Sequence, residues 1–246
     1  MIAGLTRNPY APCFHEIDTA VKALRAPNAP PVVFNAHAYP DEVPDRAVVF
    51  NLENVGVQVH PPMFDGFRKN QSCTIWDFSR RNIERLNDGG VPVTHIAVGY
   101  HSSMERFTPL PYEKKTIDVI FAGAINDRRR EVLNDLKRRG LKVCIVPDLL
   151  YGSERDALFA KSKLALNMLF YTSGVFPSLR VAHLVANRVP VLSECCPEGW
   201  DFVPTCTYEE IADRAEALVR RRREYLDHQA ESSYVSFRMR PMILPS

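Results

Sequence analysis

The chain has 246 residues, of which 46% are hydrophobic and 24% charged, and its formal net charge is +2. This composition indicates a globular protein and excludes a chain that is disordered throughout, which would carry fewer apolar residues. A net charge this close to zero gives no electrostatic argument for a nucleic-acid partner, so none is expected.

The sequence carries no targeting signal that we can identify. Its first residues contain no uninterrupted apolar segment, so no signal peptide is expected, and no apolar run is long enough to span a bilayer. The six cysteines fit no zinc-binding spacing and form no CxxC pair, so we expect neither a metal centre nor a cofactor. These features predict a cytoplasmic protein with free thiols.

Short β-rich runs alternate with helical patterns along the chain, which predicts α/β units with parallel strands. In the first half, one helix is expected around residues 15–24 and another from a cap at Ser79 to Asn87. Most strand candidates are nearly continuous apolar runs, as expected for strands covered on both faces. They are Val32–Ala36, Ala47–Leu52, Ser72–Trp76, His95–Val98, Val119–Ala122, Lys142–Val146, Leu164–Met168 and Val189–Leu192.

Four further helices are expected in the second half. The first begins at a cap on Asn126 or Asp127 and runs to Arg139, where Gly140 ends it. The other three run from Ser153 to Lys161, from Pro177 to about Asn187, and from about Tyr208 to the basic run Arg220–Arg223. The tail after Gln229 shows little periodicity, and it is expected either to pack back across the cleft or to fray.

The segment Phe107–Lys115 is polar, carries two prolines and separates two sets of strands and helices. It predicts a boundary between two domains, residues 1–108 and 109–246, each large enough for its own core. The predicted architecture is two α/β halves around a cleft.

Ligands of open parallel sheets bind beyond the carboxyl ends of the strands. In the second half, one strand ends near Gly123, and the helix that follows begins with Arg128, Arg129 and Arg130. Arginine in the first turn of a helix opposes the macrodipole, so this choice hints at an anionic ligand. A solvated basic face is an equally good explanation.

Two more places in the second half lie at the same predicted edge. The helix after the strand candidate Leu164–Met168 has Ser178 and Arg180 in its first turn, where a phosphate could bind; a simple connection between strand and helix is the alternative. The strand candidate Val189–Leu192 leads to Glu194, whose carboxylate could accept hydrogen bonds from sugar or ribose hydroxyls. For Glu194 alone, a helix cap or a surface acid is the simpler interpretation.

The first half offers one candidate for proton transfer. Glu53 follows a predicted strand, at a place where a carboxylate can act as the general base for an acceptor hydroxyl. Asp77 is a second candidate, with capping of the next helix as its alternative role.

The chain carries, in order, the segments FNLEN, WDFSRRNIERL, HIAVGY, DVIFAGAINDRRREVLNDLKRRGLKV, SKLALNML and SLRVAHLVANRVPVLSE. This ordered set resembles bacterial GT-B glycosyltransferases of a short kind found among surface-polysaccharide genes. The resemblance extends over roughly residues 32–220 and includes no single diagnostic motif.

The resemblance implies two Rossmann-like parallel-sheet domains that face a cleft, the N-terminal one reduced. The N-terminal domain would bind the acceptor and the C-terminal domain the nucleotide-sugar donor. Enzymes of this class need no bound catalytic metal, and the sequence has no DxD motif. Carried over onto this chain, the donor-binding residues would be Gly123, Asn126, Arg129, Asn167, Ser178, Arg180 and Glu194.

The predicted activity is the transfer of a sugar from a nucleotide-activated donor to a hydroxyl of a glycan or lipid-linked acceptor. Arg129 and Arg180 would stabilise the departing phosphate, and Glu53 would be the base. Retaining members often carry a glutamate near the helix that reads PSLRVAHL, and this chain has none between Glu154 and Glu194. Inverting and retaining chemistry therefore both remain open.

Three further alternatives remain open at this point. The same architecture suits a nucleotide-sugar epimerase, and the short N-terminal half also suits a non-catalytic domain that binds a partner protein or a glycan. The run Arg220–Arg223 is best interpreted as a solvated helix end. Its other interpretation is a contact with an anionic membrane, at the inner membrane face, where a lipid-linked acceptor would be presented.

Overall fold

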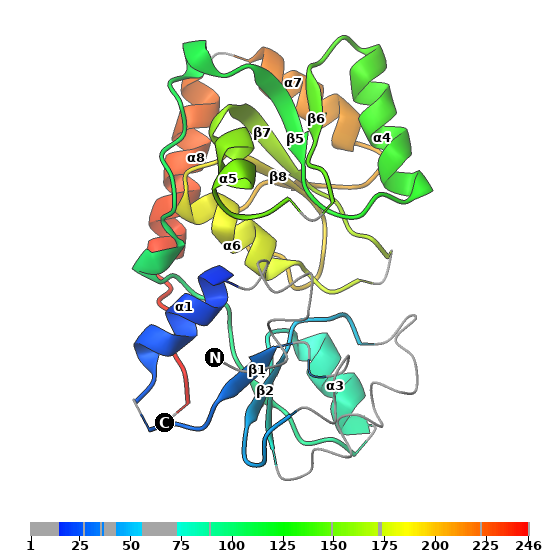
Figure 1. Cartoon of the computed structure of the whole chain (residues 1–246). Coiled ribbons are helices and arrows are strands. Elements are labelled where there is room, and N and C mark those ends of the chain that lie inside the picture. The colour runs from blue at the N-terminus through cyan, green and yellow to red at the C-terminus, as the bar shows by residue number, and fades with distance from the viewer. Residues whose placement is uncertain are drawn as a thin grey trace. The chain divides into compact units, whose positions relative to one another are not determined.

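The computed structural model describes residues 15–26, 28–34, 36, 43–55, 73–88, 90–148, 150–171, 174–221 and 223–245. The chain divides into two compact units (Figure 1). The first unit comprises the part up to Val98 together with the short segments 173–175 and 243–246, and the second comprises residues 99–172 and 176–242. The predicted domain boundary after residue 108 remains a prediction.

The first unit contains a four-stranded parallel sheet whose strands follow chain order. Its strands are β1 (Val32–Phe34), β2 (Val48–Asn51), β3 (Thr74–Asp77) and β4 (Thr94–His95). Every residue of β1 and β2 is buried, which explains their nearly continuous apolar sequence. The predicted strands are present, β1 and β2 with shorter bounds; β3 extends one residue beyond its prediction to Asp77, and β4 overlaps its prediction only at His95. Ser72 lies outside the described residues.

In the described part of the first unit, the helices are α1 (His15–Leu24) and α3 (Arg80–Asp88). Ser79 caps α3 as predicted, because its Oγ accepts a hydrogen bond from the backbone N–H of Asn82 at 3.2 Å. Leu86 of α3 packs with Val49 and Ile75 of the strands, so the unit has its own apolar core.

The second unit contains a five-stranded parallel sheet with the order β6-β5-β7-β8-β9. Its strands are β5 (Ile117–Phe121), β6 (Val143–Ile145), β7 (Ser162–Asn167), β8 (Val191–Glu194) and β9 (Thr205–Cys206). The two parallel sheets confirm the predicted fold class, α/β with two Rossmann-like domains. β9 was not predicted, because a strand of two residues leaves too short a pattern in the sequence.

Helices cover both faces of the second sheet (Figure 1). α4 (Asp127–Arg138) and α7 (Ile211–Arg220) pack on one face, where Leu133, Leu136 and Ala215 join Phe121 and Leu164 in one buried cluster. α5 (Gly152–Ala160) and α6 (Ser178–Ala186) pack on the other face, α5 against β5 and β7 and α6 against β8. α8 (Arg223–Arg238) packs against α6.

The ends of α4 follow the sequence prediction. Asn126 is the N-cap residue, and its side-chain oxygen accepts a hydrogen bond from the backbone N–H of Arg129 at 3.0 Å. Gly140, two residues after the helix ends, has a φ of +83°, a conformation that favours glycine. The cap fixes where the arginine-rich first turn of α4 begins.

α8 corrects the interpretation of the C-terminal tail, for which no helix was predicted. Its buried residues recur every three or four positions. They are Leu226, Gln229, Ala230, Ser233, Tyr234 and Phe237. Because the polar residues Gln229 and Ser233 interrupt the stripe and Ala230 is small, its hydrophobic periodicity is weak in the sequence.

Aromatic rings pack α8 against the rest of the second unit. The Trp200 ring stacks on Phe202 and on Phe237 of α8, with centroid distances of 5.2 and 5.1 Å. Phe176 meets Trp200 edge-on at 5.6 Å. Such pairs stabilise by roughly 0.5–1.5 kcal/mol each beyond the area they bury.

Beyond α8 the backbone runs beside residues 99–100. The N–H of Tyr100 donates to the carbonyl oxygen of Arg240 at 2.8 Å, and the N–H of Met242 donates to that of Tyr100 at 2.9 Å. A Cβ atom on Gly99 would lie 2.6 Å from backbone atoms of Pro241 and Met242. Glycine at position 99 therefore permits this close approach.

Candidate functional site

The strand order of the second sheet locates a candidate ligand site. From β5 the chain passes to β6 on one side and then returns to β7 on the other side. Such a reversal is a topological switch point, where open α/β sheets bind their ligands. In the first sheet the described strands follow chain order, so the part of that unit that the structure describes has no such reversal.

Gly123 lies in the loop after β5 and has a φ of +146°, which favours glycine. A Cβ atom there would lie 2.9 Å from Nη2 of Arg180, so the guanidinium group of Arg180 approaches this loop closely. Nη1 of Arg180 also donates to Oδ1 of Asn167 at 3.4 Å. The structure thus brings together Gly123, Asn167 and Arg180, which come from the ends of β5 and β7 and from α6.

Arg129 is only 3% exposed, although it lies in the first turn of a helix. Its Nη1 donates to the carbonyl oxygen of Ala124 at 2.7 Å, and its Nη2 donates to that of Met168. Its Nε is buried and has no hydrogen-bond partner among the residues described. The guanidinium group lies over the rings of Phe121 and Phe170, 5.0 and 5.1 Å from their centroids.

Burial, together with the neighbouring guanidinium group of Arg180, lowers the pKa of Arg129 to about 9. At neutral pH the side chain therefore keeps its proton. Its two donating contacts reach neutral carbonyl oxygens rather than a carboxylate. Two guanidinium groups thus lie near one another at the switch point, and the carboxylate of Glu194 partly offsets their mutual repulsion.

The first turn of α4 also binds three consecutive carbonyl oxygens after β7. Asn126 donates to the carbonyl of Phe170 at 2.9 Å, and Arg128 donates to that of Leu169 at 3.1 Å. Arg129 donates to the carbonyl of Met168. These bonds give Arg128 and Arg129 a structural role that the sequence did not reveal, and this role explains why the helix tolerates them against its macrodipole.

Glu194, at the end of β8, is buried and fully engaged by the protein. Nη1 of Arg128 donates to its Oε2 at 2.8 Å, and Nη2 donates to its Oε1. The backbone N–H of Leu169 donates to Oε2 at 2.9 Å. These contacts account for the Glu194 carboxylate without a ligand, and its suggested contact with a sugar hydroxyl remains a prediction.

Tyr208 belongs to this arrangement, although the sequence suggested only that it stands near a helix start. The guanidinium group of Arg128 lies 3.7 Å above the centroid of its ring. Its hydroxyl donates to the carbonyl oxygen of Arg128 at 2.7 Å. Burial, followed by the nearby carboxylate of Glu131, raises the pKa of Tyr208, so its hydroxyl remains a donor at neutral pH.

Ser178, the first residue of α6, is buried, and its Oγ has no hydrogen-bond partner within the described ranges. A helix N-terminus carries partial positive charge and unpaired N–H groups. The neighbouring Asn167 donates to Oγ of Ser193 at 2.9 Å, which fixes the orientation of its amide. The start of α6 therefore offers a buried hydroxyl beside Arg180, in the first turn of the same helix.

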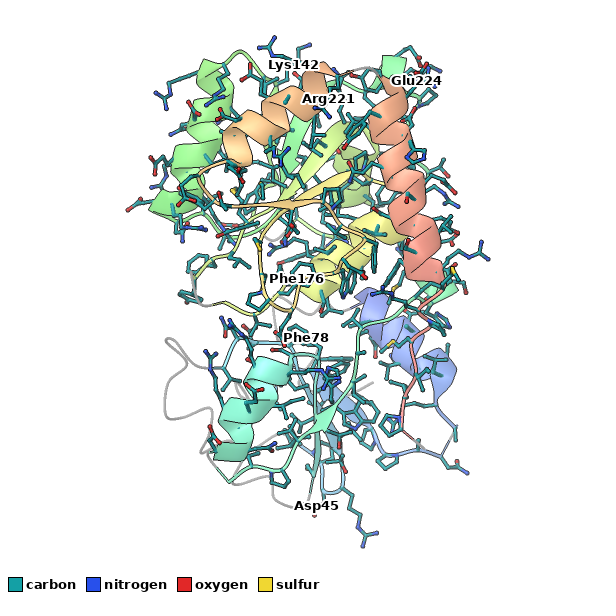
Figure 2. The ribbon with its side chains drawn as sticks, turned by 180° about the vertical axis from the view of Figure 1, so that it is seen from behind. Asp45, Phe78, Lys142, Phe176, Arg221 and Glu224 are labelled. Carbon is teal, nitrogen blue, oxygen red and sulfur yellow. The ribbon has the colours of Figure 1, made fainter. Side chains whose placement is uncertain are left out.

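The other arginines of the basic segments lie apart from this arrangement. Arg130 is exposed and pairs with Asp127 in the same helical turn. Arg220 pairs with Glu216 at 2.8 Å. Figure 2 shows Arg221 and Lys142 at the end of the second unit opposite Phe176. Membrane contact through this basic run remains a prediction.

Glu53 belongs to the first unit and is exposed on the loop after β2. Its backbone N–H donates to Oδ1 of Asn51 at 3.2 Å. Its carbonyl oxygen accepts hydrogen bonds from the side-chain amides of Asn51 at 3.1 Å and Asn82 at 2.7 Å. The loop is therefore held firmly while the carboxylate remains open to solvent, and the role of Glu53 as a base remains a prediction.

Asp77, the second candidate for proton transfer, is completely buried at the end of β3. Its carboxylate accepts hydrogen bonds from Asn51 at 2.6 Å, from Asn82 at 3.1 Å and from the backbone N–H of Ser79 at 2.7 Å. Asp77 thus binds the backbone N–H of Ser79, the residue that caps α3, and supports the start of that helix from one step away. Asn82 was missed at the sequence level because nothing in its neighbourhood indicates a contact with a loop 29 positions earlier.

No group of three or more histidine, cysteine, aspartate or glutamate side chains in the described part of the chain is arranged to hold a metal ion. None of the helices described is long and apolar enough to cross a membrane.

No protein-family model matches the chain. It is similar to an uncharacterized protein of Acanthamoeba polyphaga mimivirus, with 27% identity over 176 residues that cover 68% of this chain and 57% of that protein. Two other uncharacterized proteins of the same virus are 25% and 27% identical over 54% and 61% of this chain. The chain spans 18% and 21% of their lengths, so it corresponds to only part of these relatives.

Among solved structures, the chain is similar to the N-terminal domain of the Candida albicans trehalose-6-phosphate phosphatase. The TM-score is 0.54 with 10% identity, over 94% of this chain and 73% of that one. This similarity establishes a shared fold. A GtfA/B complex bound to UDP and GlcNAc also matches, over 88% of this chain and 55% of that one with 11% identity. Its TM-score of 0.34 is too low to establish a shared fold.

Proposed function

We propose that the chain is a glycosyltransferase whose second unit binds a nucleotide-sugar donor at the β5/β7 switch point. The observation that carries the proposal is the convergence of Arg129 and Arg180 there, with the Nη groups of Arg129 donating to two carbonyl oxygens within the described residues. The ordered segments that resemble GT-B enzymes support the same assignment.

The donor diphosphate would lie against Arg129, Arg180 and the start of α6. At this place two buried polar atoms, Nε of Arg129 and Oγ of Ser178, have no hydrogen-bond partner in the described part of the second unit. Both can donate to a phosphate oxygen. Gly123 would leave room for the anion beside the loop, because any side chain there would meet Arg180.

The chemistry follows from where charge develops. The bond between the anomeric carbon and the phosphate oxygen breaks, and negative charge grows on the departing nucleoside diphosphate. Guanidinium groups already fixed in place stabilise that charge without reorganising. The acceptor oxygen bonds to the anomeric carbon and loses its proton, for which Glu53 remains our candidate base.

The test is a thermal-shift screen against UDP, GDP, TDP, CMP and ADP, without added metal. A ligand that binds only the folded state raises the melting temperature by mass action. Arg180→Ala should weaken binding of the best nucleotide at least about tenfold, because it removes charge-assisted hydrogen bonds. Arg130→Ala, an exposed arginine in the first turn of α4, is the matched control and should bind normally.

A well-folded protein that responds to none of these nucleotides contradicts the proposal. Equal effects of Arg180→Ala and Arg130→Ala would place the binding site elsewhere. Arg129→Lys is a useful second variant, because lysine keeps the charge but cannot reach both carbonyl oxygens with a planar fork.

A non-catalytic binding domain is the second candidate, and one observation favours it. Arg128, Arg129, Asn126 and Glu194 all hold the protein's own backbone or one another. A domain could keep these contacts for stability alone. Nucleotide binding without sugar transfer or donor hydrolysis, across a panel of nucleotide-sugars and hydroxyl acceptors, would favour this candidate.

A further inference from the structure

We propose that Phe170 is the surface on which the nucleobase of the bound nucleotide stacks. This inference rests on the proposed function, because it assigns the part of the ligand that extends beyond the phosphate groups. It is independent of the sugar, of the acceptor and of the catalytic base.

Phe170 is an exposed aromatic side chain directly after a run of buried residues. Positions 164–169 are all buried, whereas the side chain of Phe170 is 36% exposed. The other large apolar side chains that the described residues expose lie on α1, on α8 or beyond it. They are Leu24, Tyr225, Val235, Met239 and Ile243. Phe170 thus differs from them in lying at the carboxyl edge of the sheet.

Phe170 is held at its backbone by one contact and at its ring by two. Asn126 binds its carbonyl oxygen at 2.9 Å, and Tyr171 meets the ring edge-on with a centroid distance of 4.7 Å. The Arg129 guanidinium lies over the ring, 5.1 Å from its centroid. A ring fixed in this way loses little conformational freedom when a ligand stacks on it, which favours binding.

Arg129 links this ring to the proposed anion site. Its guanidinium group contacts Phe170 and also stands beside Arg180. A ligand that uses both features must combine an anionic group with a flat apolar ring within the span of one side chain. A nucleoside diphosphate has this combination, whereas inorganic pyrophosphate has only the anion.

Stacking of a base on an aromatic side chain has a known size and little base preference. It contributes about 1–3 kcal/mol per base, which corresponds to roughly 5- to 150-fold in affinity. Phe170 should therefore strengthen binding of several nucleoside diphosphates alike, and groups elsewhere would select among the bases.

The experiment compares two ligands by calorimetric titration. Wild-type protein, Phe170→Ala and Phe170→Trp are each titrated with inorganic pyrophosphate and with UDP, GDP, TDP and ADP in turn. Phe170→Ala should weaken the best nucleoside diphosphate at least about fivefold and change pyrophosphate affinity less than about twofold. Phe170→Trp should retain the wild-type affinity. Met239→Ala, which truncates an exposed side chain on the turn after α8, should change neither ligand.

The possible failures can be told apart. Unchanged nucleotide affinity in Phe170→Ala overturns the stacking role, and so does an equal loss for pyrophosphate and nucleotide. If wild-type protein binds neither pyrophosphate nor any nucleotide, the proposed function itself fails and the stacking role fails with it. If pyrophosphate binds with the same affinity as every nucleotide, the anion site is supported and the proposed base contact is overturned.

Discussion

The carboxylate of Glu194 accepts hydrogen bonds from both Nη atoms of Arg128, so the end of β8 is joined to the first turn of α4. The side chain of Glu194 is 8% exposed and that of Arg128 is 19% exposed, so the ion pair is largely desolvated. Residues 66 positions apart in sequence are thereby fixed at the edge of the sheet where we place the ligand.

Removing one partner of this pair should be costly. Glu194→Ala leaves the Arg128 charge without its carboxylate and should lower the free energy of unfolding by about 3 kcal/mol. Arg128→Ala should cost a similar amount. Because each single change already breaks the pair, the double variant should cost clearly less than the sum, as measured by urea unfolding. Additive losses would show that the two side chains act independently.

Asn187 should be one of the least replaceable polar residues of the second unit. Its Oδ1 accepts from the backbone N–H groups of Arg106 at 2.6 Å and Phe107 at 2.9 Å. Its Nδ2 donates to the carbonyl oxygens of Met104 at 2.8 Å and His183 at 2.7 Å. Asn187→Ala should destabilise the protein by about 3 kcal/mol, because four backbone groups lose a partner and two of these contacts are buried.

Denaturant unfolding measures this loss, and Asn187→Asp sharpens the test. Aspartate keeps the acceptor but points a second oxygen at two carbonyl groups, so it should be no better than alanine. The exposed Asn134, on α4, is the matched control, and Asn134→Ala should change stability by less than about 0.5 kcal/mol. An Asn187→Asp protein as stable as wild type would contradict the described contacts.

The buried Asp156 should make stability depend on pH in the acid range. Burial is the largest single influence and opposes ionisation, but hydrogen bonds and charge from His183 and Arg155 outweigh it. The pKa of Asp156 therefore lies below its ordinary value of 3.8. A folded-state pKa below the unfolded one means that its stabilisation is present above about pH 4 and is lost as pH falls through the folded value.

Asp156→Asn should consequently lose stability at neutral pH, by about 3 kcal/mol, and should lose less than wild type on acidification below about pH 4. Unfolding free energies between pH 3 and pH 7 measure both effects. Asp127→Asn, a change in an almost fully exposed side chain, should follow the wild-type curve. Parallel curves for wild type and Asp156→Asn would remove Asp156 from this role.

Gly99→Ala should loosen the pairing between residue 100 and the chain beyond α8. The added Cβ would lie 2.6 Å from backbone atoms of Pro241 and Met242, and backbone must shift to admit it. The amide hydrogens of Tyr100 and Met242, which close this pairing, should then exchange with solvent faster than in wild type. Unchanged exchange at both amides would mean that the contact relaxes without breaking.

Glu53→Gln tests the candidate base. If Glu53 accepts the proton of the acceptor hydroxyl, turnover should fall about 100-fold or more while nucleotide affinity remains unchanged, because the carboxylate acts only on the acceptor. Glu84→Gln changes an exposed acid on α3 and should keep full turnover. A Glu53→Gln enzyme with normal turnover would leave the base to be found elsewhere.

Much of the fold could be predicted from local sequence. The apolar runs that became β2, β5 and β7 are buried on both faces, and the caps at Ser79 and Asn126 depend on neighbours three residues away. The misses were β9, too short to leave a pattern, and α8, whose buried stripe includes Gln229 and Ser233.

The candidate site could be predicted only in part, for a related reason. The switch-point residues were found because strand ends are visible in the sequence. The distant partners of Arg128, Asn82 and Asn187 were not found, because their contacts with Glu194, Val55 and Arg106 join residues at least 27 positions apart. Whether an arginine at a helix start binds a ligand or the protein's own backbone depends on such distant partners, which local pattern does not encode.

The three carbonyl oxygens that α4 binds after β7 have a further consequence. Asn126, Arg128 and Arg129 each bind one of three consecutive carbonyl oxygens. The end of β7 and the start of α4 are therefore held together as one rigid unit. Replacing any one of the three leaves a gap that the other two cannot close, since each reaches a different oxygen. Among diverging relatives these positions should therefore be kept or lost as a set, and a chain that retains only two of them should have rebuilt this edge of the sheet.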